Sequence, residues 1–214
     1  MIPKIFHQTW KDRNLPEDFK RWSETWKQMN PGYIYKFYTD KDIYKFIYKN
    51  YNSYFDLYES LNGIEKVDIF RYLVLHKYGG IYIDMDCECL KPISGLLDLF
   101  SKSLITGFEY ETPVQYLQWF IACPAGCKTM IELVDEIYKR SWYKWAKWSL
   151  SENQLVYWLT GPQMYTDILK KTEESVSILE KGRLGCYDKR LIDRNSYLIH
   201  HFSGSWKQKK CEPI

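Results

Sequence analysis

The chain has 214 residues, which is the size of one domain. It is 45% hydrophobic and 27% charged, a globular composition that argues against a mainly disordered chain. Its 30 basic and 27 acidic residues nearly cancel, and a net charge of +3 does not predict binding to nucleic acid. No apolar run approaches the ~20 residues of a membrane span, and the N-terminus lacks a signal-peptide pattern. We expect one domain over residues 1–214, without a transmembrane segment.

Cysteine and aromatic residues give two further expectations. The six cysteines, at positions 87, 89, 123, 127, 186 and 211, do not have the spacing of a zinc site, so free thiols in a reducing compartment are expected. Aromatic residues make up 18% of the chain, which suits a surface that binds sugars or bases, although compositional drift is an equal alternative. They are densest over residues 141–158, as a packed stripe or as a platform for an acceptor.

Strand and helix patterns alternate along the chain. In order, we predict a strand at 4–10, a helix at 16–29, a strand at 33–38, helices at 39–49 and 64–77, strands at 81–83, 103–108 and 117–123, and a helix at 130–140. Pro16 suits a first helical turn, Thr39 and Asp42 have the spacing of a capping box, and Gly79 with Gly80 ends the helix at 64–77. This alternation predicts an α/β fold with a mainly parallel central sheet flanked by helices.

The strongest chemical signal is Asp84-Met85-Asp86 at the end of the predicted strand 81–83. In open α/β sheets, ligands bind at the carboxyl ends of the strands. Two carboxylates at one strand end repel each other unless a cation lies between them, and oxygen ligands suit Mg²⁺ or Mn²⁺ bound together with substrate phosphates. A solvated turn is the common alternative for an isolated pair of this kind.

Two further groups of residues could join this strand end. Asp68 and Arg71 lie three residues apart on one helix face, either as an ordinary ion pair or as groups that bind sugar hydroxyls and an anion. Near the C-terminus, His201 could ligate a metal and Lys207 could neutralise a phosphate. A structural histidine is the alternative for His201.

With these residues the chain resembles the DXD-containing glycosyltransferases of family 32. That family includes the yeast initiating α-1,6-mannosyltransferase and bacterial transferases of the capsular polysaccharide type, and the glucosyltransferase domains of large clostridial toxins are more distantly similar. The resemblance is carried, in the family's order, by residues 2–10, 68–72, 78–86, 160–162 and 200–206. It implies a GT-A fold and a retaining transferase that uses a nucleotide-sugar with Mn²⁺ or Mg²⁺.

The resemblance also implies roles for individual residues. Those expected to bind the nucleotide-sugar are Gln8, Trp10, Asp68, Arg71, Tyr82, Asp84, Trp206 and Lys207. Those expected to hold the metal are Asp84, Asp86 and His201. Those expected to take part in catalysis are Gln118, Asp68 and Arg71, although the family's pattern has Asn where this chain has Gln118. The longer side chain leaves the role of Gln118 and the choice of donor open.

The predicted function is therefore transfer of a hexose-type sugar from a nucleotide-sugar to a hydroxyl of a glycan or other acceptor. A UDP-sugar is favoured and GDP-mannose is the alternative donor. Without a membrane anchor, we expect a cytoplasmic location in a bacterial cell or a virus-infected host cell. Two other classes stay open: a non-catalytic sugar- or nucleotide-binding protein, and a phosphatase with an aspartate nucleophile. Glu88 stands where such a phosphatase has Thr or Val.

Overall fold

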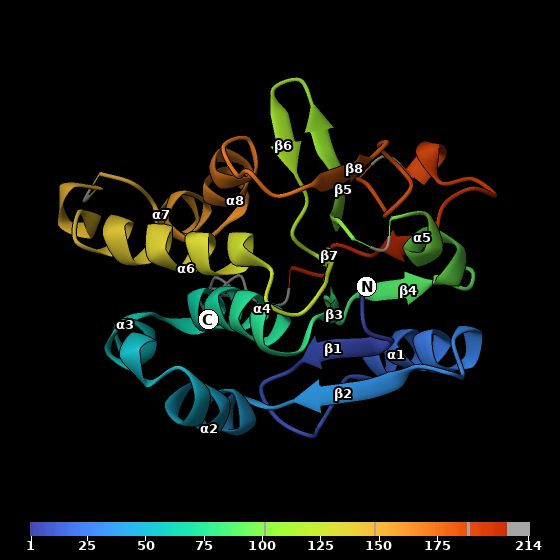
Figure 1. Ribbon diagram of the computed structural model, residues 1–214, viewed down its shortest axis with the longest axis horizontal. Helices are drawn as coiled ribbons and strands as arrows, with labels where there is room; N and C mark the ends of the chain where they lie inside the picture. The colour runs from blue at the N-terminus through green and yellow to red at the C-terminus, as the bar shows by residue number, and fades with distance from the viewer. Residues whose placement is uncertain (101, 148, 188, 205–214) are drawn as a thin grey trace, which may run out of the picture.

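The computed structural model describes residues 1–100, 102–147, 149–187 and 189–204 (Figure 1). Its main feature is a seven-stranded sheet in the order β2-β1-β3-β7-β5-β6, with β8 also paired to β5. The strands are β1 (Ile5–Thr9), β2 (Ile34–Tyr38), β3 (Gly80–Ile83), β5 (Leu104–Glu111), β6 (Val114–Tyr116), β7 (Phe120–Cys123) and β8 (Val176–Leu179). A second sheet pairs β4 (Cys87–Cys89) with β9 (Leu198–His200).

Helices cover the sheet. They are α1 (Glu17–Met29), α2 (Asp40–Asn50), α3 (Phe55–Ser60), α4 (Gly63–Tyr78), α5 (Ser94–Leu99), α6 (Lys128–Ser141), α7 (Glu152–Leu159) and α8 (Pro162–Leu169). Short 3₁₀ turns occupy Asn52–Tyr54, Lys144–Lys147 and Lys189–Leu191. The predicted α/β architecture is confirmed: β1, β2, β3, β5 and β8 run in one direction, and β6 and β7 run in the other.

Two hydrophobic cores lie on opposite faces of the sheet. One forms beneath α2, α4, α6 and α8 and includes Tyr82 and Ile121 of the strands. The other forms beneath α1 and α5 and includes Ile81 and Phe120. Because Ile81 and Tyr82 are neighbours in one strand, their side chains point to opposite faces, as do those of Phe120 and Ile121. Each of these strands therefore has to be apolar on both faces, as its sequence is.

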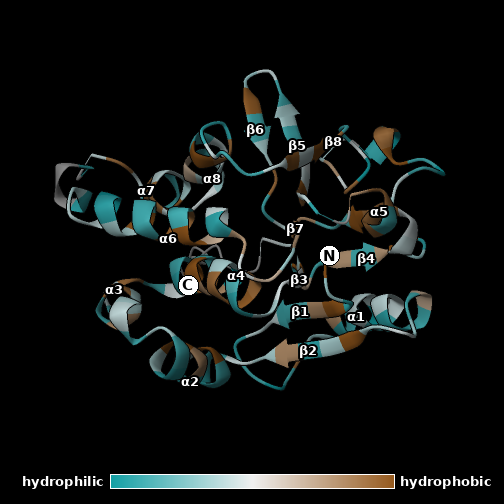
Figure 2. Ribbon diagram, viewed as in Figure 1, coloured by the Kyte–Doolittle hydropathy of each residue, from teal (hydrophilic) through white to brown (hydrophobic). Residues whose placement is uncertain are grey.

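Helix α4 is the central helix of the structure. The eight residues from Asp68 to Leu75 are all buried, so this helix is covered on every side. In Figure 2, α4 carries brown hydrophobic residues, whereas α2 and α6 show teal hydrophilic turns on their outer sides. Asn62 and Glu65 form a capping box at the start of α4, and Gly79 ends it. The two charged residues Asp68 and Arg71 are thus enclosed within a core helix.

Gly79 and Gly80 connect α4 to β3 in a turn that other residues would not fit. Gly79 has φ 60° and Gly80 has φ 96°, in the left-handed region that favours glycine. A Cβ atom on Gly79 would lie 2.4 Å from the backbone nitrogen of Ala125, and one on Gly80 would lie 2.6 Å from the carbonyl oxygen of Ile5. The pair therefore lets β3 follow α4 directly and sets where Asp84 emerges.

The predicted element bounds need some corrections. The strand expected at 103–108 extends to Glu111, and the one expected at 117–123 begins only at Phe120, so Gln118 precedes it. Strands β4, β6, β8 and β9 were not predicted, and each has only three or four residues. Cys87, Cys89, Cys123 and Cys127 are free thiols, as expected. No described helix is both long and apolar enough to cross a membrane.

Candidate active site

A cavity of about 520 Å³ lies where β1 and β3 end. Trp10 follows β1 and Asp84 and Asp86 follow β3, while Asp68 and Arg71 come from α4, and all five line the cavity. Since β1 and β3 are adjacent and parallel, their carboxyl ends meet at one edge of the sheet. The volume is in the range of sites that enclose a small molecule.

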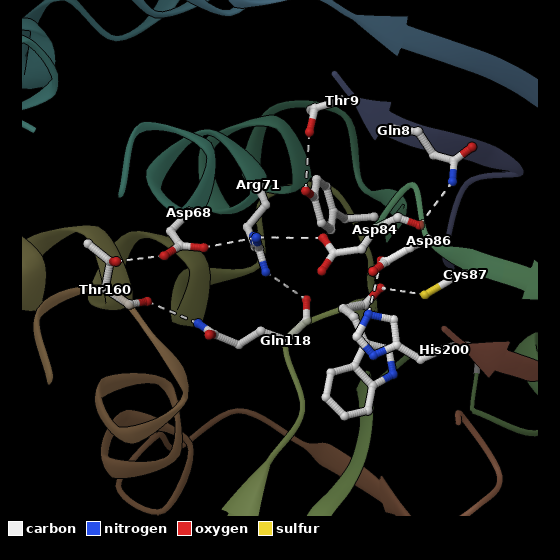
Figure 3. A network of polar contacts seen from close by, with 12 residues as sticks. Gln8, Thr9, Asp68, Arg71, Asp84, Asp86, Cys87, Gln118, Thr160 and His200 are labelled. Atoms are coloured by element: carbon white, nitrogen blue, oxygen red, sulfur yellow. Dashed lines mark hydrogen bonds and ion pairs between the residues drawn. The ribbon is translucent and has the colours of Figure 1, made fainter. Parts of the chain in front are cut away.

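Asp68, Arg71 and Asp84 form a charged network in this cavity (Figure 3). Nη2 of Arg71 lies 2.8 Å from Oδ1 of Asp68 and 3.6 Å from Oδ1 of Asp84. Nη1 of Arg71 donates to the carbonyl oxygen of Gln118 at 3.0 Å, and the Thr160 hydroxyl donates to Oδ2 of Asp68 at 2.6 Å. The network joins α4, the end of β3 and the segment before α8, so only the folded chain assembles it.

The network holds charges out of water. Burial raises the pKa of Asp68 to about 6, although Arg71 and Thr160 favour its charged form. Burial, opposed by Arg71, also raises the pKa of Asp84. Among the described residues, the buried Nε of Arg71 has no hydrogen-bond partner. Ionisable groups with shifted pKa values and an unused donor, all at a cavity, are typical of a functional site.

Three residues expected to bind the nucleotide-sugar lie around this network, but not all of them reach the cavity. Trp10 and Tyr82 line it, and the guanidinium of Arg71 lies 4.7 Å from the centre of the Tyr82 ring. Gln8 is fully buried, receives a hydrogen bond from the Tyr35 hydroxyl at 2.6 Å and donates to the carbonyl oxygen of Asp84 at 3.2 Å. Gln8 therefore supports Asp84 from behind and does not line the cavity.

Asp86 belongs to a second polar group. Nε2 of His200 lies 3.0 Å from Oδ1 of Asp86, and the backbone N–H and hydroxyl of Ser203 donate to Oδ2 at 2.9 and 2.8 Å. Although burial alone would raise it, these hydrogen bonds lower the pKa of Asp86 to about 2. Nδ1 of His200 is buried without a partner among the described residues. Asp86 is thus a carboxylate at neutral pH.

The structure brings His200 to Asp86, whereas His201 was the histidine expected there. The His201 imidazole stacks on Trp22 at 4.0 Å and lies 2.9 Å from Oε2 of Glu88. Two adjacent residues of an extended segment point in opposite directions, and the register of β9 against β4 decides which one faces the cavity. Both histidines are visible in the sequence, but the pairing of β9 with β4 is not.

The side chains around Asp86 are suited to a divalent cation in part. Asp86, Cys87 and His200 offer ligand atoms within 4.8 Å of one another. A carboxylate and an imidazole suit Mn²⁺ or Mg²⁺. Cys87 does not fit as a ligand, because burial raises the pKa of its thiol well above the usual value and a hard cation prefers oxygen.

Comparison with known proteins identifies the first half of this site. Residues 16–105, which include the network of α4 and the Asp84-Met85-Asp86 motif, match the family described as a glycosyltransferase sugar-binding region containing a DXD motif. The match covers less than half of the chain, and over this region it confirms the family resemblance predicted from the sequence.

The relatives and fold neighbours of this chain carry the names of glycosyltransferases. An inositol phosphoceramide mannosyltransferase of Schizosaccharomyces pombe is 37% identical over 131 residues, which cover 58% of this chain and 39% of the relative. The initiation-specific α-1,6-mannosyltransferase of Candida albicans is 28% identical over 200 residues, covering 78% and 52%. The UDP-bound glycosyltransferase domain of the YGT toxin has a TM-score of 0.61 at 9% identity, covering 83% and 79%, so it shares the fold.

The chain is shorter than these sequence relatives. Its matched part spans between 26% and 50% of the length of five curated relatives. The family match therefore covers the DXD region and not the whole chain.

Gln118 lines the cavity but also belongs to the hydrogen-bonded framework around it. Its Nε2 donates to the carbonyl oxygen of Thr160 at 3.0 Å and to the hydroxyl of Tyr72. Both amide hydrogens are therefore used, and Oε1 is the atom left to meet a substrate. The side chain that departs from the family's Asn thus reaches Thr160 through its amide.

The structure adds a cavity residue that the sequence analysis missed. Glu109 of β5 is only 6% exposed, lines the cavity, and accepts a hydrogen bond from Nε2 of Gln115 at 2.6 Å. Burial raises its pKa, against the effect of its hydrogen bonds. The strand was expected to end at Phe108, which placed Glu109 in a loop. The signal that could have found it is the alternation of aromatic and acidic residues that continues along β5 to residue 111.

Two expectations fall outside the described residues, and one is partly described. Trp206 and Lys207, expected at the diphosphate, belong to the segment 205–214 that the structure does not describe. In the aromatic-rich part, Trp142 and Tyr143 are 65% and 63% exposed, so these two rings are not core residues. Trp158 lies beneath the Lys147 ammonium, 5.2 Å from its ring centre.

Proposed function

We propose that this chain is a retaining glycosyltransferase that moves a hexose from a nucleotide-sugar to a hydroxyl of a glycan or other acceptor. The observation that carries the proposal is the placement of Asp68, Arg71 and Asp84 beside Asp86 and His200 in one cavity. The first group can hold the hydroxyls of a sugar, and the second can hold a divalent cation that binds a diphosphate. The match to the DXD family covers Asp68, Arg71, Asp84 and Asp86 of these two groups.

The donor is proposed to lie with its base towards Trp10 and its sugar against α4. Trp10 lines the cavity next to Phe19, with ring centres 4.7 Å apart and nearly perpendicular planes, and such a ring can stack on a nucleobase. Asp68 and Arg71 would bind the hydroxyls of the transferred sugar, and Tyr82 and Asp84 would contact the ribose and the sugar. A UDP-sugar is favoured by the UDP-bound fold neighbour, while relatives named mannosyltransferases support GDP-mannose as the alternative.

Transfer breaks the bond between the anomeric carbon and the diphosphate oxygen, and the electron pair stays on the β-phosphate. The sugar becomes oxocarbenium-like, and the acceptor oxygen forms the new bond from the same side. The acceptor proton passes to the departing phosphate oxygen, which gives retention without a covalent intermediate. Asp68 has both oxygens engaged, by Arg71 and Thr160, which disfavours it as the nucleophile of a double displacement.

A divalent cation, Mn²⁺ or Mg²⁺, completes the proposal. Asp86 and His200 would hold it, with Asp84 nearby; His201, the residue first expected, would have to leave Glu88 to take part. When bound, such an ion stabilises the negative charge of the leaving diphosphate. The family's DXD motif supports this dependence.

One experiment separates this function from its rivals. The purified chain is heated with each of a set of UDP- and GDP-sugars in Mn²⁺, because a bound donor raises the unfolding temperature. The donor that stabilises most is then incubated with the enzyme, and nucleoside diphosphate release is measured with and without acceptor. Release that depends on acceptor supports a transferase, binding without release supports a non-catalytic protein, and phosphate release from a phosphomonoester supports a phosphatase.

A cytoplasmic location is proposed with this function.

A further inference from the structure

The part of the cavity beside β5 contains a second set of polar and aromatic side chains that the proposed donor site does not use. Glu109, Tyr187 and Phe202 line the same cavity as Asp86 and come from β5, the loop before residue 189 and the segment after β9. None of them belongs to the DXD region, which ends at residue 105.

Glu109 is built into a hydrogen-bond chain that fixes its position. Gln115 donates to one of its oxygens at 2.6 Å, and the hydroxyl of Tyr157 in turn donates to Oε1 of Gln115. A carboxylate can accept about four hydrogen bonds, so lone pairs remain for a ligand in the cavity.

An aromatic wall stands beside this carboxylate. The rings of Tyr187 and Phe202 stack with centres 3.7 Å apart, and Tyr187 is still 54% exposed. Phe202 holds φ at 49°, a left-handed conformation that a non-glycine residue rarely adopts and that is concentrated at ligand-binding sites. Phe202 also contacts the His200 ring at 4.0 Å, so this wall adjoins the histidine that binds Asp86.

We propose that Glu109, Tyr187 and Phe202 form the acceptor subsite and that its ligand is a hexopyranose ring. A sugar presents an apolar C–H face to aromatic rings and hydroxyls at its rim to a carboxylate, which matches this pairing of groups. The contact from Phe202 to His200 places the subsite next to the proposed diphosphate end of the donor, where an attacking hydroxyl is needed. The inference rests on the proposed transferase function, because it assigns the second substrate of the same cavity.

The test measures binding directly, so that it does not depend on turnover. Methyl α-mannopyranoside, methyl α-glucopyranoside and methyl β-galactopyranoside are each titrated in the presence of UDP and Mn²⁺, and saturation-transfer NMR reports contact with the protein. We expect at least one glycoside to bind. Glu109→Gln and Tyr187→Ala should each weaken its affinity at least tenfold, whereas UDP affinity, measured by calorimetry, should change less than twofold.

Glu111→Gln is the matched control, because it makes the same change on the same strand at an exposed residue and should leave glycoside affinity unaltered. If Glu109→Gln fails to fold, Tyr187→Ala decides the matter, since this ring is more than half exposed. The inference is overturned if no glycoside of the set binds, or if both variants bind as the wild type does. The proposed function fails separately, when no donor yields a nucleoside diphosphate.

Discussion

Replacing Asp68 by Asn should remove sugar transfer and, at the same time, remove a pH-dependent loss of stability. Asn has nearly the shape of Asp, and its amide oxygen can still accept the hydrogen bond from Thr160. Transfer should fall because the proposed hydroxyl ligand loses its charge and Arg71 loses a partner at 2.8 Å. Stability should respond differently, because the buried carboxylate of Asp68 is costly to ionise.

The size of the effect follows from the shift in pKa. Burial raises the pKa of Asp68 from 3.8 to about 6, so the native state binds this proton more tightly than the unfolded state does. The stabilising contribution of that proton is fully present below pH 3.8 and is lost as the pH rises through about 6. The full loss is about 3 kcal/mol, of which about 2 kcal/mol falls between pH 4.5 and 7.5.

Urea denaturation at pH 4.5 and pH 7.5 measures the difference. The free energy of unfolding of the wild type should fall by about 2 kcal/mol more over this interval than that of Asp68→Asn, since the other titrating groups are common to both proteins. Asp98→Asn, an exposed carboxylate on α5, is the control and should behave as the wild type. Equal pH dependence in the wild type and Asp68→Asn, within about 0.5 kcal/mol, would refute the reasoning.

Three further predictions concern the metal, the base and the frame of the domain. Asp86→Ala should lower transfer in Mn²⁺ by ~10²-fold or more, as loss of a preorganised electrostatic contact does, and near-normal turnover would contradict its role at the metal. Trp10→Ala should weaken UDP binding by roughly 1–3 kcal/mol and raise KM for the donor more than it lowers kcat; unchanged UDP affinity in calorimetry would make Trp10 a packing residue. Glu174→Gln should destabilise the protein by about 1–2 kcal/mol at pH 7, measured in urea, because its carboxylate accepts hydrogen bonds at the start of α6 from Cys127 and Thr129. Those bonds, working against burial, lower the pKa of Glu174 to about 2. The stability that they contribute should therefore disappear as the pH falls from 4.5 towards 2. If the free energy of unfolding of Glu174→Gln fell over this interval as much as that of the wild type, the prediction would be wrong.

Much of the architecture could be predicted from local sequence patterns. The helix at 64–77 was found because apolar residues at helical spacing end at two glycines, and α4 runs from Gly63 to Tyr78. The capping box of Thr39 and Asp42 is present as its spacing predicted. Asp84 could be placed at a strand end because the strand and the turn before it are both encoded within eight residues. These features depend on neighbours in the chain, which the sequence displays.

The partners of each site residue could not be predicted in the same way. Asp68 depends on Thr160, 92 residues away, and Asp86 depends on His200, 114 residues away. Choosing His200 over His201 required the register of β9 on β4, and a shift of one residue would reverse the choice. Glu109 was missed because only the extension of β5 and its pairing with Gln115 bury it in the cavity.

The sequence by itself determined which chemistry the chain carries: carboxylates at a strand end, a charged pair in a core helix and an aromatic residue after the first strand. Tertiary structure alone decided how these groups are used, since burial sets the charge state of Asp68 and Glu109 and long-range contacts set the reach of Gln8 and Gln118. The physical reason is that desolvation and hydrogen bonding depend on what surrounds a group in space, and those surroundings come from segments distant in the chain.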